Sequence, residues 1–241
     1  MNDGQVPFAF WNSLATDISI FSWSAGLLIF LIYLIRLVLI SDLKKKYDFI
    51  IKNEINWLWV AGLCMVVGAG FFANTGITEI TRMWIFVRAF MTIALGLMVA
   101  LVVQNLLKFY YPFYIEKRLK RLRYKPRVSP DGNKMTLLTE SDEDVYLDEG
   151  MQAEENLYSV DYDVWKDEST GYIKIEKYSG HLHAVECPEC NYQTLKIQHE
   201  DVIRIATPEL DGALEKHYRC SYCGHKSKKT VHLKFSYKFD A

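Results

Sequence analysis

The chain has 241 residues, a formal net charge of −1 and a hydrophobic share of 50%. These averages conceal a division, because residues 1–107 are rich in large apolar side chains whereas residues 108–241 are charged. A single soluble domain of this length would mix the two kinds of segment. The composition therefore excludes one soluble domain and predicts a membrane half followed by a soluble half.

Three apolar runs lie in the first half, at residues 21–40, 57–73 and 83–107. Each is near the roughly 17–25 residues that a helix needs to cross a hydrocarbon core of about 30 Å. The second run is the shortest, and a re-entrant segment is its structural alternative. We predict a membrane α-helical unit with three spans, formed by residues 1–107.

Lysine and arginine placement predicts the orientation of these spans. The first 35 residues contain neither residue, DLKKKYD (42–48) follows the first span, and YIEKRLKRLRYKPR (114–127) follows the third. Cationic flanks remain on the cytoplasmic side. We therefore expect an integral membrane protein, of the bacterial inner membrane, with its N-terminus outside and its C-terminal half in the cytoplasm.

Residues 108–138 form a basic juxtamembrane segment. We expect five of its cations to contact anionic lipid headgroups, each contributing roughly 1 kcal/mol: Lys117, Arg118, Lys120, Arg121 and Arg123. The alternative is that these charges only fix the orientation. Nucleic acid is a disfavoured partner, because residues 128–241 hold 22 acidic and 13 basic side chains, a net charge of −9 that repels phosphate.

Residues 139–168 carry twelve carboxylates. Such a composition is typical of a solvated, partly disordered linker. The apolar residues interleaved with the carboxylates, among them Leu147 and Trp165, instead favour a segment that docks. A short tether joins it to the basic segment, so the sequence predicts that the acidic segment folds back onto those cations or binds a basic partner.

The soluble half contains two C-x2-C elements. In a reducing compartment stable disulfides are rare, and this spacing indicates a metal site. Two such turns supply four thiolates at tetrahedral corners, about 2.3 Å from a zinc ion. Asn191 and Gly224, which follow the two turns, are residue types that tolerate a positive φ. The candidate ligands are Cys187, Cys190, Cys220 and Cys223.

Runs of β-branched and aromatic residues flank these cysteines, as in GYIKIEKY (171–178) and TVHLKFSYKF (230–239), and predict a β-rich domain over residues 169–241. Cysteine turns on short hairpins resemble the zinc-ribbon family, a resemblance that covers residues 180–238 and implies the same four cysteines as zinc ligands. The cysteine spacing also resembles that of rubredoxins, which carry iron, so zinc is the expected metal and iron the alternative.

Two groups of small residues mark the second span. Ala61, Cys64 and Gly68 share one helical face, and Gly62, Ala69 and Ala73 lie near another. Small residues allow close helix approach, so we expect packing within the bundle or against a partner. Arg36 and Arg88 lie about one turn from span ends, where their side chains can reach the headgroups.

Four cysteines close the coordination shell, which favours a structural metal over a catalytic one. The sequence contains no P-loop, H-E-x-x-H or dinucleotide fingerprint. We therefore expect a membrane-anchored zinc-ribbon interaction or assembly module: a subunit or accessory factor of a larger membrane complex with an unidentified protein partner, or a homo-oligomer. The alternatives are a membrane-bound rubredoxin-like electron carrier and a small channel subunit. Of the six histidines, only His225 is placed to donate to a thiolate.

Overall fold

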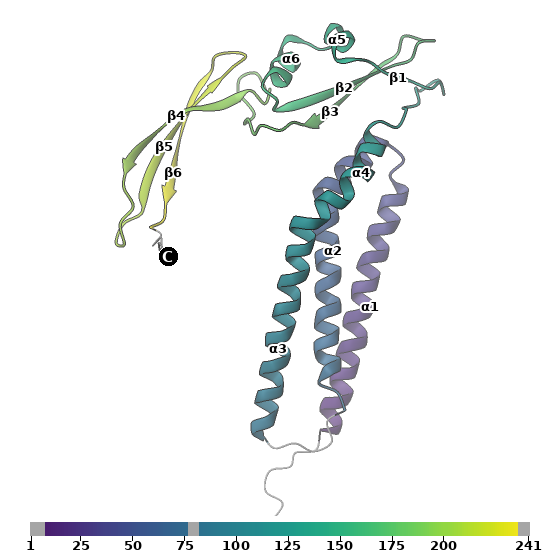
Figure 1. Cartoon of the computed structure of the whole chain (residues 1–241), viewed down its shortest axis with the longest axis vertical. Coiled ribbons are helices and arrows are strands. Elements are labelled where there is room, and N and C mark those ends of the chain that lie inside the picture. The colour runs from purple at the N-terminus through teal and green to yellow at the C-terminus, as the bar shows by residue number, and fades with distance from the viewer. Residues whose placement is uncertain (1–7, 77–81, 236–241) are drawn as a thin grey trace, which may run out of the picture. The chain divides into compact units, whose positions relative to one another are not determined.

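A computed structural model describes residues 8–76 and 82–235, which form two compact units, Met1–Lys125 and Pro126–Ala241 (Figure 1). Some sequence expectations lie outside the described residues. They concern the N-terminal tail (1–7), part of the loop after the second span (77–81) and the end of the last expected strand (236–239).

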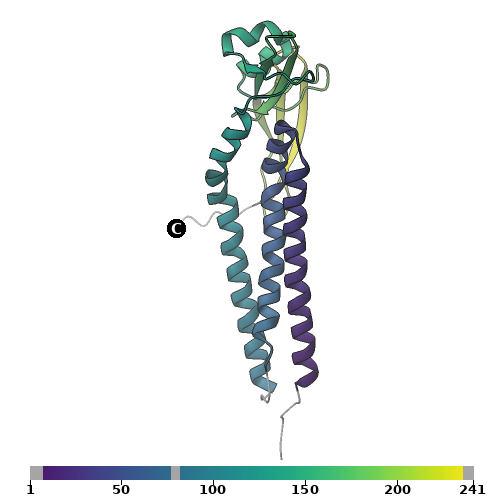
Figure 2. The same cartoon turned by 90° about the vertical axis from the view of Figure 1, so that its right-hand side faces the viewer.

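The first unit consists of long helices. They are α1 (Ala9–Leu39), α2 (Leu43–Ala73) and a third that runs from α3 (Arg82–Asn105) through a π-helical turn (Leu106–Tyr110) into α4 (Tyr111–Arg123). All three are long and apolar enough to cross a membrane, which confirms three candidate spans. Helix α2 lies between its two neighbours (Figures 1 and 2) and is continuous over 31 residues.

The first two helices begin well before the apolar runs at residues 21 and 57. Helix α1 begins at Ala9, and α2 begins at Leu43, where the Asp42 carboxylate accepts a 2.9 Å hydrogen bond from the amide of Lys45. An aspartate at this position satisfies an otherwise unpaired amide and fixes the helix start. The first turns of both helices contain polar residues and lie before the apolar runs. Hydropathy alone therefore places the start of each helix too late in the sequence.

Small residues bring α1 and α2 together. A Cβ atom built on Gly68 would lie 2.4 Å from the Trp23 ring, and one on Gly26 would lie 3.1 Å from the Ala61 carbonyl oxygen. The Trp23 indole donates a 3.2 Å hydrogen bond to the carbonyl of Met65. The expected close packing on the Ala61–Cys64–Gly68 face is confirmed.

The second small-residue face is confirmed only in part. Gly62 faces Val103 of α3, 3.7 Å from where its Cβ atom would lie. Ala69 and Ala73 are exposed instead.

A buried carboxylate joins α4 to the other helices. Glu54 of α2 is 1% exposed and accepts hydrogen bonds from the hydroxyls of Tyr33 and Tyr111 and from Arg118 Nη1 at 3.1 Å. A carboxylate removed from water needs such partners. Arg118, which the sequence assigned to lipid headgroups, is therefore ion-paired within the unit, although its side chain remains 40% exposed. Lys117, Lys120 and Arg121 are exposed.

The acidic stretch of the second unit is folded, which argues against the alternative of a partly disordered linker. Residues 139–168 contain helix α5 (Glu140–Glu143), a 3-10 turn (Asp144–Tyr146), helix α6 (Glu149–Asn156) and strand β2 (Val160–Lys166). Strand β2 pairs with β1 (Thr136–Leu137) and β3 (Ile173–Ser179) in an antiparallel sheet. The domain boundary expected between residues 168 and 169 falls inside the β2–β3 hairpin.

The core of this sheet is small and includes buried charges. Leu147, Val160, Tyr162 and Val164 form its apolar centre. Beside it, Arg127 forms a buried ion pair with Glu176 at 2.7 Å, and its guanidinium lies 4.8 Å from the centroid of the Trp165 ring. Both charged side chains are at most 3% exposed. The last cation of the basic sequence run thus belongs to the folded second unit.

Strands β4 (Leu195–Arg204), β5 (Gly212–Cys220) and β6 (Lys226–Leu233) form a second antiparallel sheet. A small β region with clustered cysteines therefore follows three long apolar helices, as the sequence predicted at this level of detail. The run at 171–178, which the sequence placed with the cysteine domain, forms β3 of the other sheet.

Candidate metal centre

Each C-x2-C element forms a tight turn closed by backbone hydrogen bonds. In the first, the Asn191 amide donates to the Cys187 carbonyl at 2.8 Å, and the Cys187 amide donates to the Tyr192 carbonyl at 2.9 Å. In the second, the Cys220 amide donates to the His225 carbonyl at 2.8 Å. Asn191 has φ 63° and Gly224 has φ 75°. Both positive φ values were predicted from the residue types.

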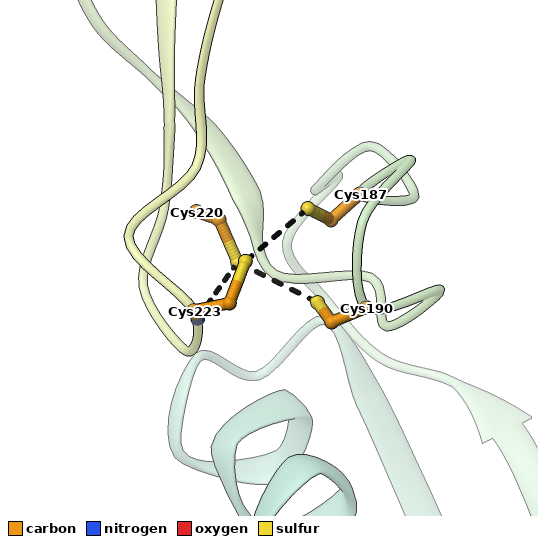
Figure 3. A group of neighbouring side chains, drawn as sticks. All are labelled: Cys187, Cys190, Cys220 and Cys223. Carbon is orange, nitrogen blue, oxygen red and sulfur yellow. Dashed lines mark hydrogen bonds between the residues drawn. The ribbon is translucent and has the colours of Figure 1, made fainter.

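The two turns bring the four thiols together (Figure 3). All four sulfur atoms lie within 4.8 Å of one another. The Cys187–Cys223 sulfur distance is 3.6 Å and the Cys190–Cys220 distance is 3.8 Å. A regular tetrahedron with metal–sulfur bonds of about 2.3 Å has edges of about 3.8 Å. The four cysteines, all free thiols, are therefore positioned to bind one metal ion.

Hydrogen bonds to sulfur stabilise a thiolate at Cys220. Burial raises its pKa, but a 3.0 Å contact with the Thr194 hydroxyl and a 3.3 Å hydrogen bond from the Cys223 amide outweigh burial and lower the pKa to about 6. Thr194 is itself fully buried. A hydrogen-bonded thiolate is the form that binds metal.

The neighbouring thiols hold their protons in the absence of a cation. The His225 amide lowers the pKa of Cys223, but burial and the other three cysteines raise it to about 12. Burial likewise raises the pKa of Cys190. Four thiolates this close repel one another, and a divalent ion would remove that cost.

The site lies at one end of the second sheet and is joined to helix α6. Cys187 and Cys220 are buried and pack with Leu195, whereas Cys223 is exposed. Tyr192, which follows the first turn, donates a 3.0 Å hydrogen bond to Asp148 at the start of α6. The turn therefore rests on the acidic segment, residues 139–168.

Histidines contribute little to this site. The His225 ring lies 3.8 Å from the Glu189 carboxylate, and its backbone rather than its ring contacts the Cys223 sulfur. Cys64 belongs to α2 of the first unit, where it packs near Gly26. Sequence reasoning missed a second cluster, formed by His199, Asp201 and His217. An alternating His-x-Asp on a strand was the available signal, but its partner strand could not be aligned from sequence.

Comparisons of this chain with protein-family models, with curated protein sequences and with solved structures give no match.

Proposed function

We propose that the second unit carries a zinc-ribbon domain with one structural Zn²⁺, and that the chain is a membrane-anchored interaction or assembly module within a larger membrane complex. The four-sulfur cluster carries this proposal. Four protein ligands leave no coordination position for a substrate, which is typical of structural zinc sites. Such an ion stabilises a small domain whose apolar core is too small to keep the domain folded without metal.

Exposed apolar side chains support an interaction role. Val202, Ile203, Ile205 and Leu210 are 52–77% exposed and lie at the end of the β4–β5 hairpin remote from the cysteines. Exposed apolar clusters of this kind mark protein or membrane contact sites. The zinc site would hold the base of the hairpin while its tip contacts a partner protein or a second copy of the chain.

We propose the topology that the basic flanks predict, with the N-terminus outside and the second unit in the cytoplasm. Lys117, Lys120 and Arg121 would then contact anionic headgroups, together with Arg123 and the exposed part of Arg118. Labelling single cysteines with a membrane-impermeant maleimide in intact cells tests this. A cysteine at Ser13 should react and one at Ser169 should not. Reaction at Ser169 alone would reverse the topology and remove the argument for a reducing compartment.

The interaction role is tested by site-specific photocrosslinking in native membranes. A photoreactive amino acid at Ile205 should give a discrete adduct with a second protein or another copy of the chain, identified by mass spectrometry. The matched control is Val145, which is 83% exposed. It lies in the 3-10 turn Asp144–Tyr146, in the part of the unit that contains the β1–β2–β3 sheet and not the β4–β5 hairpin. The proposal fails if positions 203, 205 and 210 give no adduct, or if Val145 gives the same one.

Electron transfer is the second candidate function, supported by the exposure of Cys223, which brings a sulfur of the site to solvent. Four thiolates suit iron as well as zinc. A purified protein with iron–thiolate absorption bands that bleach on reduction would favour this function over the structural one.

A channel function has less support. The Arg36 guanidinium lies 5.8 Å from the Trp57 ring centroid, and Arg88 donates a hydrogen bond to the Ala73 carbonyl. Both contacts suit anchoring near the ends of the spans better than ion passage at mid-bilayer depth.

A further inference from the structure

A second group of metal-binding side chains lies on strands β4 and β5, away from the cysteines. His199 is paired directly with His217, and Asp201 is paired with Glu215. Directly opposed residues of an antiparallel pair share one face of the sheet. Two imidazoles and two carboxylates therefore form a square patch on one face.

A β-bulge creates this patch. The pairing shifts between Ile197 and His199, so that Gln198 is an extra residue in β4. Without the bulge, His199 and Asp201 would lie on the face of Leu195 and Ile197, because side chains alternate along a strand. With it, they lie on the face of His217 and Glu215.

The atoms of this patch are within reach of a single ion. Ligand atoms of His199, Asp201 and His217 lie within 4.8 Å of one another. The Nε2 atoms of His217 and His199 lie 2.9 Å and 3.6 Å from Asp201 Oδ2. Metal–nitrogen and metal–oxygen bonds of about 2.0–2.2 Å give tetrahedral edges of about 3.4 Å. The observed distances lie on either side of that value.

The Nε2 atom of His217 lacks a hydrogen-bond partner in the described residues, although carboxylates lie close to it. This atom is buried, and Asp201 and Glu215 oxygens are both 2.9 Å away. The His199 and His217 rings are stacked, with centroids 4.0 Å apart. Both Nε2 atoms lie within 3.6 Å of Asp201 Oδ2, but near-parallel rings hold their nitrogen lone pairs in separate planes, so one ring must turn about its side-chain bonds for both to bind one ion. A metal ion between the nitrogens and the carboxylates would then supply the partner that His217 Nε2 lacks.

We propose that His199, Asp201 and His217 bind a second divalent ion of the zinc class, with Glu215 as a further ligand. Imidazole and carboxylate together suit zinc, nickel and copper better than calcium. These four side chains would complete a tetrahedral shell, and a five-coordinate ion would in addition bind water or a group on a partner. Lys228 of β6 places a competing positive charge at the patch, with its Nζ 3.0 Å from Glu215, and its side chain is 63% exposed.

This site is separate from the cysteine site. His217 is three residues from Cys220 along β5, which is about 10 Å at the usual rise of a strand. His199→Asn removes a ligand only from the second site, so loss of the second ion with the first retained distinguishes the two sites.

The test is equilibrium dialysis of the full-length protein in mild detergent against buffered Zn²⁺, with zinc per chain measured by mass spectrometry. One ion should be retained at the cysteines and a second should bind as free Zn²⁺ rises. His199→Asn, at a half-exposed position, should weaken the second ion at least about tenfold, the minimum expected for losing a direct ligand. His232→Asn, at an exposed position of the same sheet, is the matched control and should retain two ions.

Cobalt provides an independent readout. Co²⁺ added to zinc-loaded protein should give weak visible bands without sulfur-to-cobalt charge transfer, and His199→Asn should abolish these bands. The proposal is overturned if no second ion binds below about 0.1 mM free Zn²⁺. It is equally overturned if His199→Asn and His217→Asn leave the second ion unchanged, since binding would then be adventitious.

Discussion

The backbone amide of Gln193 donates a 2.5 Å hydrogen bond to the Glu154 carboxylate, which is fully buried. Gln193 follows the first cysteine turn, and Glu154 lies in α6. The same carboxylate accepts hydrogen bonds from the Tyr162 hydroxyl and from Lys177 Nζ at 2.9 Å. One side chain of the acidic stretch therefore joins the four-cysteine site to the neighbouring sheet.

Replacing Glu154 with alanine should destabilise the second unit. The change leaves the Gln193 amide and the Tyr162 hydroxyl without their acceptor, which costs roughly 1.5–3 kcal/mol for hydrogen bonds to a charged group. The Lys177 pair adds little, because that side chain is 44% exposed and screened by solvent. Hydrogen exchange of the full-length protein should show faster exchange at both cysteine turns.

The control for this change is Glu149→Ala, at an exposed position of the same helix. Equal exchange in the two variants would show that Glu154 does not support the metal centre.

Glu143 predicts an unusual pH dependence. Burial and repulsion from Glu140 raise the pKa of this carboxyl to about 7 in the folded protein. Because the folded pKa exceeds the unfolded one, near 4.5, its contribution to stability is complete below about pH 4.5 and is lost as the pH rises through about 7. The free energy of unfolding should therefore fall less between pH 5 and pH 8 in Glu143→Gln than in the wild type.

Fluorine NMR of 5-fluorotryptophan-labelled protein measures this unfolding in the presence of the membrane unit, because Trp165 is the one tryptophan of residues 126–241. Urea titration of the Trp165 resonance at both pH values gives the comparison. If the variant loses stability from pH 5 to pH 8 just as the wild type does, Glu143 is not the group responsible.

Gly68 should be the most sensitive small residue of α2. A methyl group there would meet the Trp23 ring at 2.4 Å, whereas one at Gly62 would meet Val103 at an ordinary 3.7 Å. Gly68→Ala should displace the Trp23 indole from the Met65 carbonyl and lower the thermal stability of the helical unit in detergent. Gly62→Ala should leave stability unchanged or raise it slightly, since alanine favours helix. A larger loss at Gly62 than at Gly68 would contradict the helix packing described here.

The candidate spans and the cysteine turns were predictable because their causes are local. A long apolar run indicates a span from its own residues, and Asn191 and Gly224 identify the positive φ that each turn requires. The fold of the acidic stretch was not predictable because its carboxylates find partners remote in sequence. Asp167 accepts a hydrogen bond from Asn133, and Glu154 accepts one from Lys177. A count of carboxylates cannot reveal those partners.

The patch at His199 and His217 was hidden for a similar reason. It depends on a one-residue bulge at Gln198, and a bulge changes the face of every following side chain without leaving a distinct mark on composition. The same limit applies to Arg118, whose ion pair with Glu54 spans 64 residues of sequence.

Cys187, Cys190, Cys220 and Cys223 are proposed to bind one structural zinc ion. Elemental analysis of the full-length protein, purified after expression with balanced metal supply, is the decisive measurement. We expect at least one zinc per chain, with one ion lost in Cys220→Ser and retained in Cys64→Ser, and rapid hydrogen exchange of the cysteine turns once a chelator removes the ion. Protein that is fully folded without metal, or whose four cysteines hold iron or form disulfides, would contradict the proposal.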